Sequence, residues 1–194
     1  APGDPLDVVV DADGLAELRA AGASFAVIDA DIDATARAEA ARLQAPEASA
    51  NADFFAEFRD YRAIEARMVE LAELAPQRAQ VQGIGSTLDG RTLWALHIGG
   101  GTPGDSAAGK TPMLINGGQH AREWISTMSA TCIADRLVRD YDADAAIRAF
   151  VDSTDLWVVP VVNPDGYQYS WAQDRYWRKN RRGGHGVDLN RNFG

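Results

Sequence analysis

The chain has little of several residue types, and each scarcity narrows what the protein can be. Cysteine occurs once, as Cys132, so no disulfide can form within the chain and cysteine usage does not reveal the compartment. No run of 18 apolar residues occurs, so no membrane partner is predicted. Acidic residues outnumber Lys and Arg by 28 to 19, and the resulting net charge of −9 argues against general nucleic-acid binding.

Residues 1–43 show a β-α-β pattern followed by a further helix. The short apolar runs at residues 6–10 and 25–28 are typical of strands, and residues 13–21 between them predict a helix with Asp13 as its N-cap. The alanine-rich stretch that ends this segment is also predicted to be helical. Residues 44–53 have linker composition, so we expect the domain boundary there and a second domain over residues 54–194.

The second domain alternates predicted strands and helices. The expected helices are residues 61–75, 125–140 and 143–151, and the expected strands are residues 81–87, 92–98, 112–116 and 156–162. Asp89-Gly90 marks a hairpin between the first two strands, and Pro160 indicates a bulge or the end of the last one. This alternation predicts an α/β fold with a mixed, mostly parallel twisted sheet flanked by helices. Sites in such folds form beyond the carboxyl ends of strands.

His120 and Glu123 carry the clearest chemical signal, within the segment Gly-Gly-Gln-His-Ala-Arg-Glu-Trp at residues 117–124. At the start of a helix, two side chains three residues apart can turn toward one point. A neutral imidazole and a carboxylate are suitable zinc ligands, and the paired glycines allow close approach of the backbone. By itself this spacing is more typical of a solvated helix start, so its meaning depends on the motifs that follow.

Three such motifs follow in order: Asn-Pro-Asp-Gly-Tyr at residues 163–167, Trp-Arg-Lys-Asn-Arg at 177–181 and Asp-Leu-Asn-Arg-Asn-Phe at 188–193. Across roughly residues 55–194 this ordered set resembles the zinc metallocarboxypeptidases of the carboxypeptidase A/B/T type. The resemblance implies one zinc ion and hydrolysis of the C-terminal bond of peptides or proteins that have a free C-terminus. It also implies a secreted, extracellular or periplasmic location.

The resemblance assigns roles near the metal. His120 and Glu123 match the first two zinc ligands of the family, and Asp188 matches the aspartate that supports the histidine, fixing its tautomer and raising its basicity. Arg178 matches the arginine that polarises the scissile carbonyl and stabilises the oxyanion. Zinc would acidify a bound water and polarise the peptide carbonyl.

Three further residues match the part of the family site that binds substrate. Asn190 and Arg191 match the pair that grips the C-terminal carboxylate, and a guanidinium suits that group because it forms paired, charge-assisted hydrogen bonds. Arg122 matches an additional arginine on the substrate side. A basic loop in an acidic protein fits the steering of an anionic peptide terminus.

The third zinc ligand, the glutamate base and the specificity residue of the family have no match up to Gly194. His97 is expected to be a half-exposed strand residue and His185 lies in a glycine-rich loop, so neither is predicted to complete the site. We therefore expect the chain to be a fragment, truncated on the C-terminal side, with little or no peptidase activity alone. The sequence does not indicate which C-terminal residue a substrate would need.

Other interpretations remain open. The pattern of residues 1–43 resembles the second half of the family's pro-segment, which implies a zymogen cut by an activating protease within residues 44–53; the alternative is an N-terminal extension without an inhibitory role. The second domain could instead be a related zinc acylase-type hydrolase, which assays on acylated amino acids against peptides would separate. A non-catalytic module that binds peptides with free C-termini is the third possibility.

Overall fold

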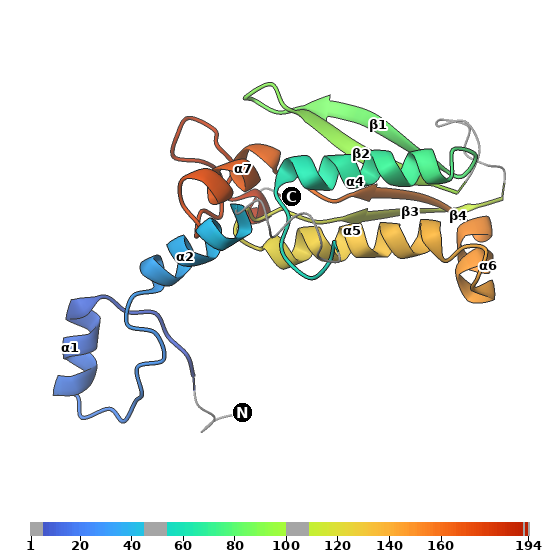
Figure 1. The fold of residues 1–194 in the computed structure, drawn as a ribbon. Helices are drawn as coiled ribbons and strands as arrows, with labels where there is room; N and C mark the ends of the chain where they lie inside the picture. The colour runs from blue at the N-terminus through green and yellow to red at the C-terminus, as the bar shows by residue number, and fades with distance from the viewer. Residues whose placement is uncertain (1–5, 45–53, 100–108, 192, 194) are drawn as a thin grey trace. The chain divides into compact units, whose positions relative to one another are not determined.

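The computed structural model divides the chain into two compact units, Ala1–Thr35 and Ala36–Gly194 (Figure 1). The residues that the structure describes are 6–44, 54–99, 109–191 and 193. Apart from Gln44, the predicted linker at residues 44–53 lies outside them and stays a prediction. None of the helices in these described ranges is long and apolar enough to cross a membrane.

The first unit contains helix α1, Ala12–Ala20, and the predicted strands on either side of it do not form. Asp11 is the N-cap, because its side chain accepts a hydrogen bond from the Gly14 backbone N–H at 2.8 Å; the prediction of Asp13 as N-cap was wrong. Residues 6–10 and 25–28 are exposed and unpaired with any strand in the described part of the chain. A short apolar run becomes a strand only where a neighbour supplies backbone partners, so the predicted β-α-β unit is wrong here.

The second unit is built around a four-stranded mixed sheet with strand order β1-β2-β4-β3. Its strands are β1 (Ala79–Ser86), β2 (Thr92–Ile98), β3 (Thr111–Asn116) and β4 (Thr154–Val159). Only the β3–β4 pairing is parallel, and the β1–β2 and β2–β4 pairings are antiparallel. The sheet is therefore mixed as predicted, but the expectation of a mostly parallel sheet does not hold for these strands.

Local sequence explains where several of these elements begin and end. Gly90 has a φ of 79° in the turn that joins β1 to β2, so the predicted Asp-Gly hairpin is confirmed. Strand β4 ends immediately before Pro160, which cannot donate to a sheet ladder. Asp60 caps α4 (Tyr61–Leu74) by accepting from the Ala63 backbone N–H at 2.8 Å.

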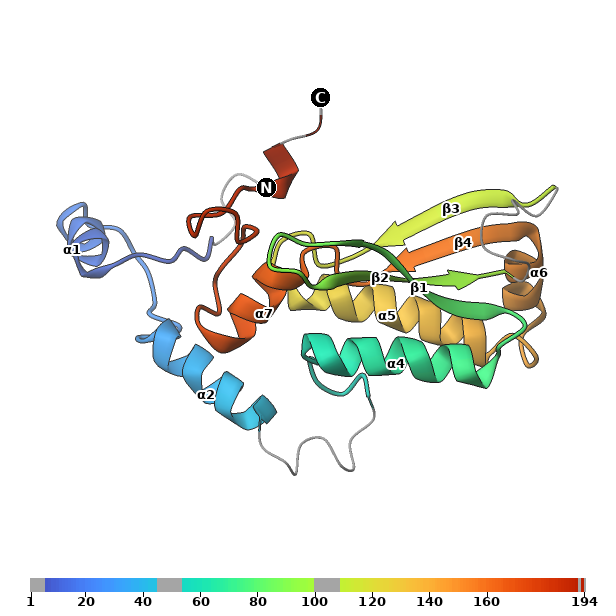
Figure 2. The same ribbon diagram turned by 90° about the horizontal axis from the view of Figure 1, so that it is seen from above.

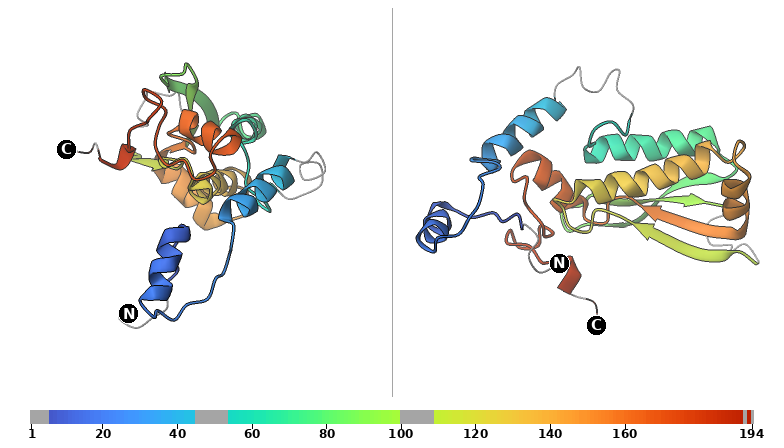
Figure 3. Two further views of the ribbon diagram at one scale, coloured as in Figure 1. Left: turned by 90° about the vertical axis from the view of Figure 1, so that its left-hand side faces the viewer. Right: turned by 90° about the horizontal axis from the view of Figure 1, so that it is seen from below.

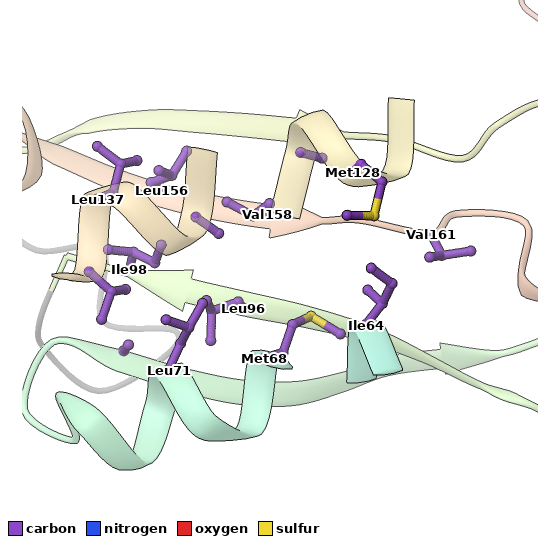
Figure 4. Close-up of a cluster of buried hydrophobic side chains, with 14 of the residues drawn as sticks. Ile64, Met68, Leu71, Leu96, Ile98, Met128, Leu137, Leu156, Val158 and Val161 are labelled. Carbon is purple, nitrogen blue, oxygen red and sulfur yellow. The ribbon is translucent and has the colours of Figure 1, made fainter. Parts of the chain in front are cut away.

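Helices α4 and α5 (Trp124–Arg139) lie side by side on one face of the sheet (Figures 2 and 3). Helix α6 (Ala145–Ser153) precedes β4, and α7 (Pro164–Ala172) follows it. The apolar face of α4 packs toward β1 and β2, and that of α5 toward β2 and β4, so that both helices share one buried core (Figure 4). The buried residues at the centre of this core include Ile64, Met68, Leu71, Leu96, Ile98, Leu156 and Val158.

Candidate metal and carboxylate-binding site

The site is built on the loops that leave the carboxyl ends of β3 and β4. Gly117 continues the pairing beyond both strands, since its N–H donates to Val159 O at 2.9 Å and its carbonyl accepts from Val162 N at 3.0 Å. A Cβ on Gly117 would lie 2.6 Å from Ser126 O and 2.9 Å from Pro160 O. No larger residue fits there, which explains the first glycine of the motif.

His120 is held between two carboxylates. Its Nδ1 lies 2.9 Å from Glu123 Oε1, and its Nε2 lies 3.3 Å from Asp188 Oδ1, although Asp188 is 68 residues away in the sequence. His120 is only 8% exposed, so these contacts fix the plane of the ring. The two nitrogens have separate surroundings: Nδ1 faces Glu123 and Nε2 faces Asp188.

Arg178 contacts both carboxylates that flank His120, so the four side chains form one charged cluster. Its Nε donates to Asp188 Oδ2 at 3.0 Å and its Nη1 to Glu123 Oε1 at 3.4 Å. The hydrogen bond from Arg178, assisted by one from the Asn190 backbone N–H, lowers the pKa of Asp188 to about 2. Asp188 is therefore ionised at neutral pH, and it joins the histidine, the arginine and the turn that follows.

The comparison with known proteins settles the family. The family model described as "Zinc carboxypeptidase" matches residues 64–194. The chain belongs to the zinc carboxypeptidase family. "Inactive metallocarboxypeptidase ECM14" from Saccharomyces cerevisiae is 40% identical over 146 residues, which cover 73% of this chain and 34% of that protein. The protein of the same name from Ajellomyces capsulatus is 37% identical over 154 residues, covering 77% and 25%.

Solved structures show the same fold. Thrombin activatable fibrinolysis inhibitor (TAFI) superposes with a TM-score of 0.77 at 29% identity, covering 94% of this chain and 45% of that one. Carboxypeptidase A from Helicoverpa armigera gives a TM-score of 0.75 at 29% identity, covering 93% and 45%. The chain thus spans under half the length of these structures and about a third or less of the curated relatives.

The donor types fit the zinc of this family, but the described residues provide an incomplete set. A catalytic zinc site has three protein ligands, and imidazole and carboxylate are both among its usual donors. His120 Nδ1 and Glu123 Oε1 lie next to each other, 2.9 Å apart, while Asp188 lies on the Nε2 side of the ring, where a supporting carboxylate belongs. Within the described ranges, no group of three His, Cys, Asp or Glu side chains is placed to hold a metal.

The residues predicted to bind substrate lie at the surface around this cluster. Asn190 and Arg191 are exposed in a short 3₁₀ turn, Leu189–Arg191, where Arg191 Nη1 donates to Asn190 O at 2.7 Å. Arg122 is exposed one residue before Glu123, and its carbonyl accepts from Arg175 Nη1 at 2.9 Å. Their roles in binding substrate stay predictions.

The other histidines lie apart from the cluster. His97 is 4% exposed, pairs with Asp155 and stacks on Trp157 with the ring centroids 4.6 Å apart, so the expectation of a half-exposed residue was wrong. Trp157, which pairs with His97 from the neighbouring strand β4, covers the imidazole ring. The sequence of β2 alone does not show this contact. His185 is exposed and contacts Gly183 O at 3.1 Å.

Sequence reasoning missed the role of Arg175 in supporting the site. The Arg175 guanidinium lies 3.6 Å from the centroid of the Trp124 ring, and Trp124 stacks on Trp171 at 4.1 Å. Arg175 also donates to Glu39 Oε2 at 3.0 Å, which ties it to α2 (Ile32–Gln44). The stack immobilises the first turn of α5, directly after Glu123. An arginine in a basic loop gave no sequence signal for this contact.

Proposed function

We propose that this chain forms part of a zinc-dependent exopeptidase site that hydrolyses the C-terminal bond of peptides or proteins. The arrangement of His120 between Glu123 and Asp188, with Arg178 beside them, carries the proposal. His120 and Glu123 would hold one zinc ion, and the third protein ligand would come from outside these 194 residues. When bound, zinc supplies Lewis-acid activation of water and of the peptide carbonyl.

The chain's own residues would bind and orient the substrate. Arg178 places a fixed positive charge next to the metal ligands, where negative charge develops on the carbonyl oxygen during hydrolysis. Arg191, with Asn190, would hold the terminal carboxylate through paired hydrogen bonds, and Arg122 would add a further cation on the substrate side. Recognition of a free carboxylate would restrict cleavage to the last residue.

The experiment compares two proteins: the 194-residue chain and the protein as its gene encodes it. We expect the gene-encoded protein to release the C-terminal residue of a blocked dipeptide, and a chelator or Arg191→Ala to abolish that release. The 194-residue chain alone should show little or no turnover, because two ligands hold zinc poorly. Turnover by the 194-residue chain that both treatments abolish would refute the claim that it is insufficient.

A second candidate is a non-catalytic module that binds peptides with free C-termini. The observation that favours it is the name of the curated relatives, which are called inactive metallocarboxypeptidases. This alternative keeps Asn190 and Arg191 as the carboxylate clamp and dispenses with hydrolysis. Isothermal titration of the gene-encoded protein with a peptide and its C-terminal amide separates the two candidates. Binding of the free acid that survives chelation, without cleavage, would support the module.

The upstream segment has a proposed regulatory role. We propose that residues 1–43 belong to a pro-segment of a secreted or periplasmic zymogen and that an activating protease cuts within residues 44–53. The exposure of every residue of α1 and its flanks, apart from Gly14, Leu15 and Leu18, fits a small appendage more than a core element. Limited proteolysis that left residues 44–53 intact while cutting elsewhere would count against this proposal.

A further inference from the structure

Asn163 is 3% exposed, and its side chain contacts the backbone of both loops that carry the site residues. It follows β4 and is the N-cap of α7, where its Oδ1 accepts from the Gly166 N–H at 3.1 Å. Its Nδ2 donates to two carbonyls, Lys179 O at 3.0 Å and Gln119 O at 3.2 Å. Both protons and one acceptor position of the amide are thus engaged, and no other uncharged side chain of this size offers that combination.

The two carbonyls belong to the neighbours of the site's principal residues. Gln119 immediately precedes His120, and Lys179 immediately follows Arg178. Between them a direct backbone hydrogen bond runs from Ala121 N to Arg178 O at 2.9 Å. The amide of Asn163 therefore fastens the loop that carries the zinc-ligand motif to the loop that carries the arginine, and both to the end of β4.

Packing around α7 reinforces this arrangement. A Cβ on Gly166 would lie 2.4 Å from Lys179 O, so that carbonyl rests directly on the glycine. Farther along α7, the single proton of Ser170 Oγ is shared between Tyr167 O at 2.7 Å and Ala121 O at 3.0 Å, and the oxygen accepts from Trp124 Nε1 at 2.8 Å. Helix α7 is thus a platform to which both loops are attached by buried polar groups.

We propose that Asn163 is a positioning residue that sets the separation between His120 and Arg178. It acts through the Gln119 and Lys179 carbonyls and touches neither a metal nor a substrate. The consequence for zinc binding rests on the proposed function, whereas the joining of the two loops does not. The experiment therefore measures the joining of the loops and the zinc affinity separately.

Three variants isolate the bridge from the helix cap. Asn163→Asp and Asn163→Ser both keep an oxygen to cap α7 but remove the two N–H donors. Asp165→Asn is the control, two residues along the same helix turn and 6% exposed. Its carboxylate accepts from Thr87 Oγ1 at 2.9 Å and Arg91 Nη1 at 2.6 Å, so it joins α7 to the β1–β2 hairpin and not to the site loops.

The first readout is hydrogen exchange of the Ala121 amide, followed by NMR in the metal-free protein as its gene encodes it. We expect each Asn163 variant to lower protection of Ala121 at least tenfold more than protection of the β2 amides. Asp165→Asn should lower the protection of Ala121 no more than that of the β2 amides, because its contacts are to the β1–β2 hairpin. Equal loss at Ala121 and β2 in the Asn163 variants would overturn the proposal.

A measurement on the unmodified protein decides the question if neither Asn163 variant folds. The side-chain NH₂ of Asn163 should exchange at least tenfold more slowly than that of the exposed Asn190. Exchange at the same rate would overturn the bridge.

Zinc affinity is the second readout, measured by competition with a chromophoric chelator. The Asn163 variants should bind zinc about tenfold more weakly, as removal of outer-shell support typically does, while Asp165→Asn should bind it as the unmodified protein does. An unchanged affinity would overturn the link to the metal ligand. If the unmodified protein bound no zinc, the proposed function would fail, and the exchange result would still decide the bridge.

Discussion

Substituting Gly166 by alanine tests how closely α7 and the Arg178 loop are packed. The added Cβ would lie 2.4 Å from Lys179 O and 2.5 Å from Asn163 Nδ2, whereas ordinary contacts begin at 3.4 Å. The carbonyl would have to retreat by about 1 Å, which breaks its hydrogen bond to Asn163. Alanine is the better helix former by about 1 kcal/mol. Overpacking and a lost buried hydrogen bond each cost about 1–3 kcal/mol.

The net expectation is a decrease of about 3 kcal/mol in the free energy of unfolding, measured by urea denaturation followed by far-UV circular dichroism. Gly85→Ala is the matched control, because its Cβ would meet only Leu93 Cδ1 at 3.7 Å. That control should change stability by no more than about 0.5 kcal/mol. A Gly166→Ala protein as stable as the unmodified one would refute the close contact between α7 and Lys179.

Further outcomes follow from other contacts. Asp188→Asn removes the negative charge that Arg178 contacts and should weaken zinc binding tenfold or more in a chelator competition. The control Asp152→Asn loses only a hydrogen bond from the Tyr141 hydroxyl and should leave the zinc affinity unchanged. Equal zinc affinities of the two variants would contradict the supporting role of Asp188. Leu71→Ala, at a site that is 0% exposed, should cost about 2–5 kcal/mol in urea denaturation, and a cost below about 1 kcal/mol would contradict the packing of α4. Burial raises the pKa of Tyr61 to about 12 from 10.0, so the folded state favours the neutral phenol; this contribution is complete below pH 10 and is lost as the pH rises toward 12. Tyr61→Phe should therefore lose less stability over that interval, and an equal loss in alkaline unfolding would show that Tyr61 is not the cause.

Much of the second unit was predictable because its signals are local. The spacing of Ile64, Met68 and Leu71 predicted the buried face of α4, and Asp89-Gly90 predicted the β1–β2 turn. The order of the strands was not predictable in this way, since β4 inserts between β2 and β3 through pairings between residues far apart in the chain. The predicted strands at residues 6–10 and 25–28 failed for a related reason: a strand depends on its neighbours.

For the candidate site, the motifs identified residues whose side chains the structure brings together, but not the groups that hold them. His120, Glu123, Arg178 and Asp188 were all expected from the sequence, and they form one cluster. Asn163 was singled out only as the first residue of the Asn-Pro-Asp-Gly-Tyr motif. The carbonyls that its side chain contacts lie 44 and 16 residues away in the sequence. Every residue has a backbone carbonyl, so the residue types at those positions could not predict the contact.

The zinc content of the protein as its gene encodes it tests the central claim most directly. The ratio of zinc to protein would be measured by inductively coupled plasma mass spectrometry after loading with zinc and exhaustive dialysis, for the unmodified protein and for His120→Ala. The account predicts about one zinc per chain in the first and close to none in the second. No zinc in the unmodified protein, or the same content in both, would contradict the assignment of His120 as a metal ligand.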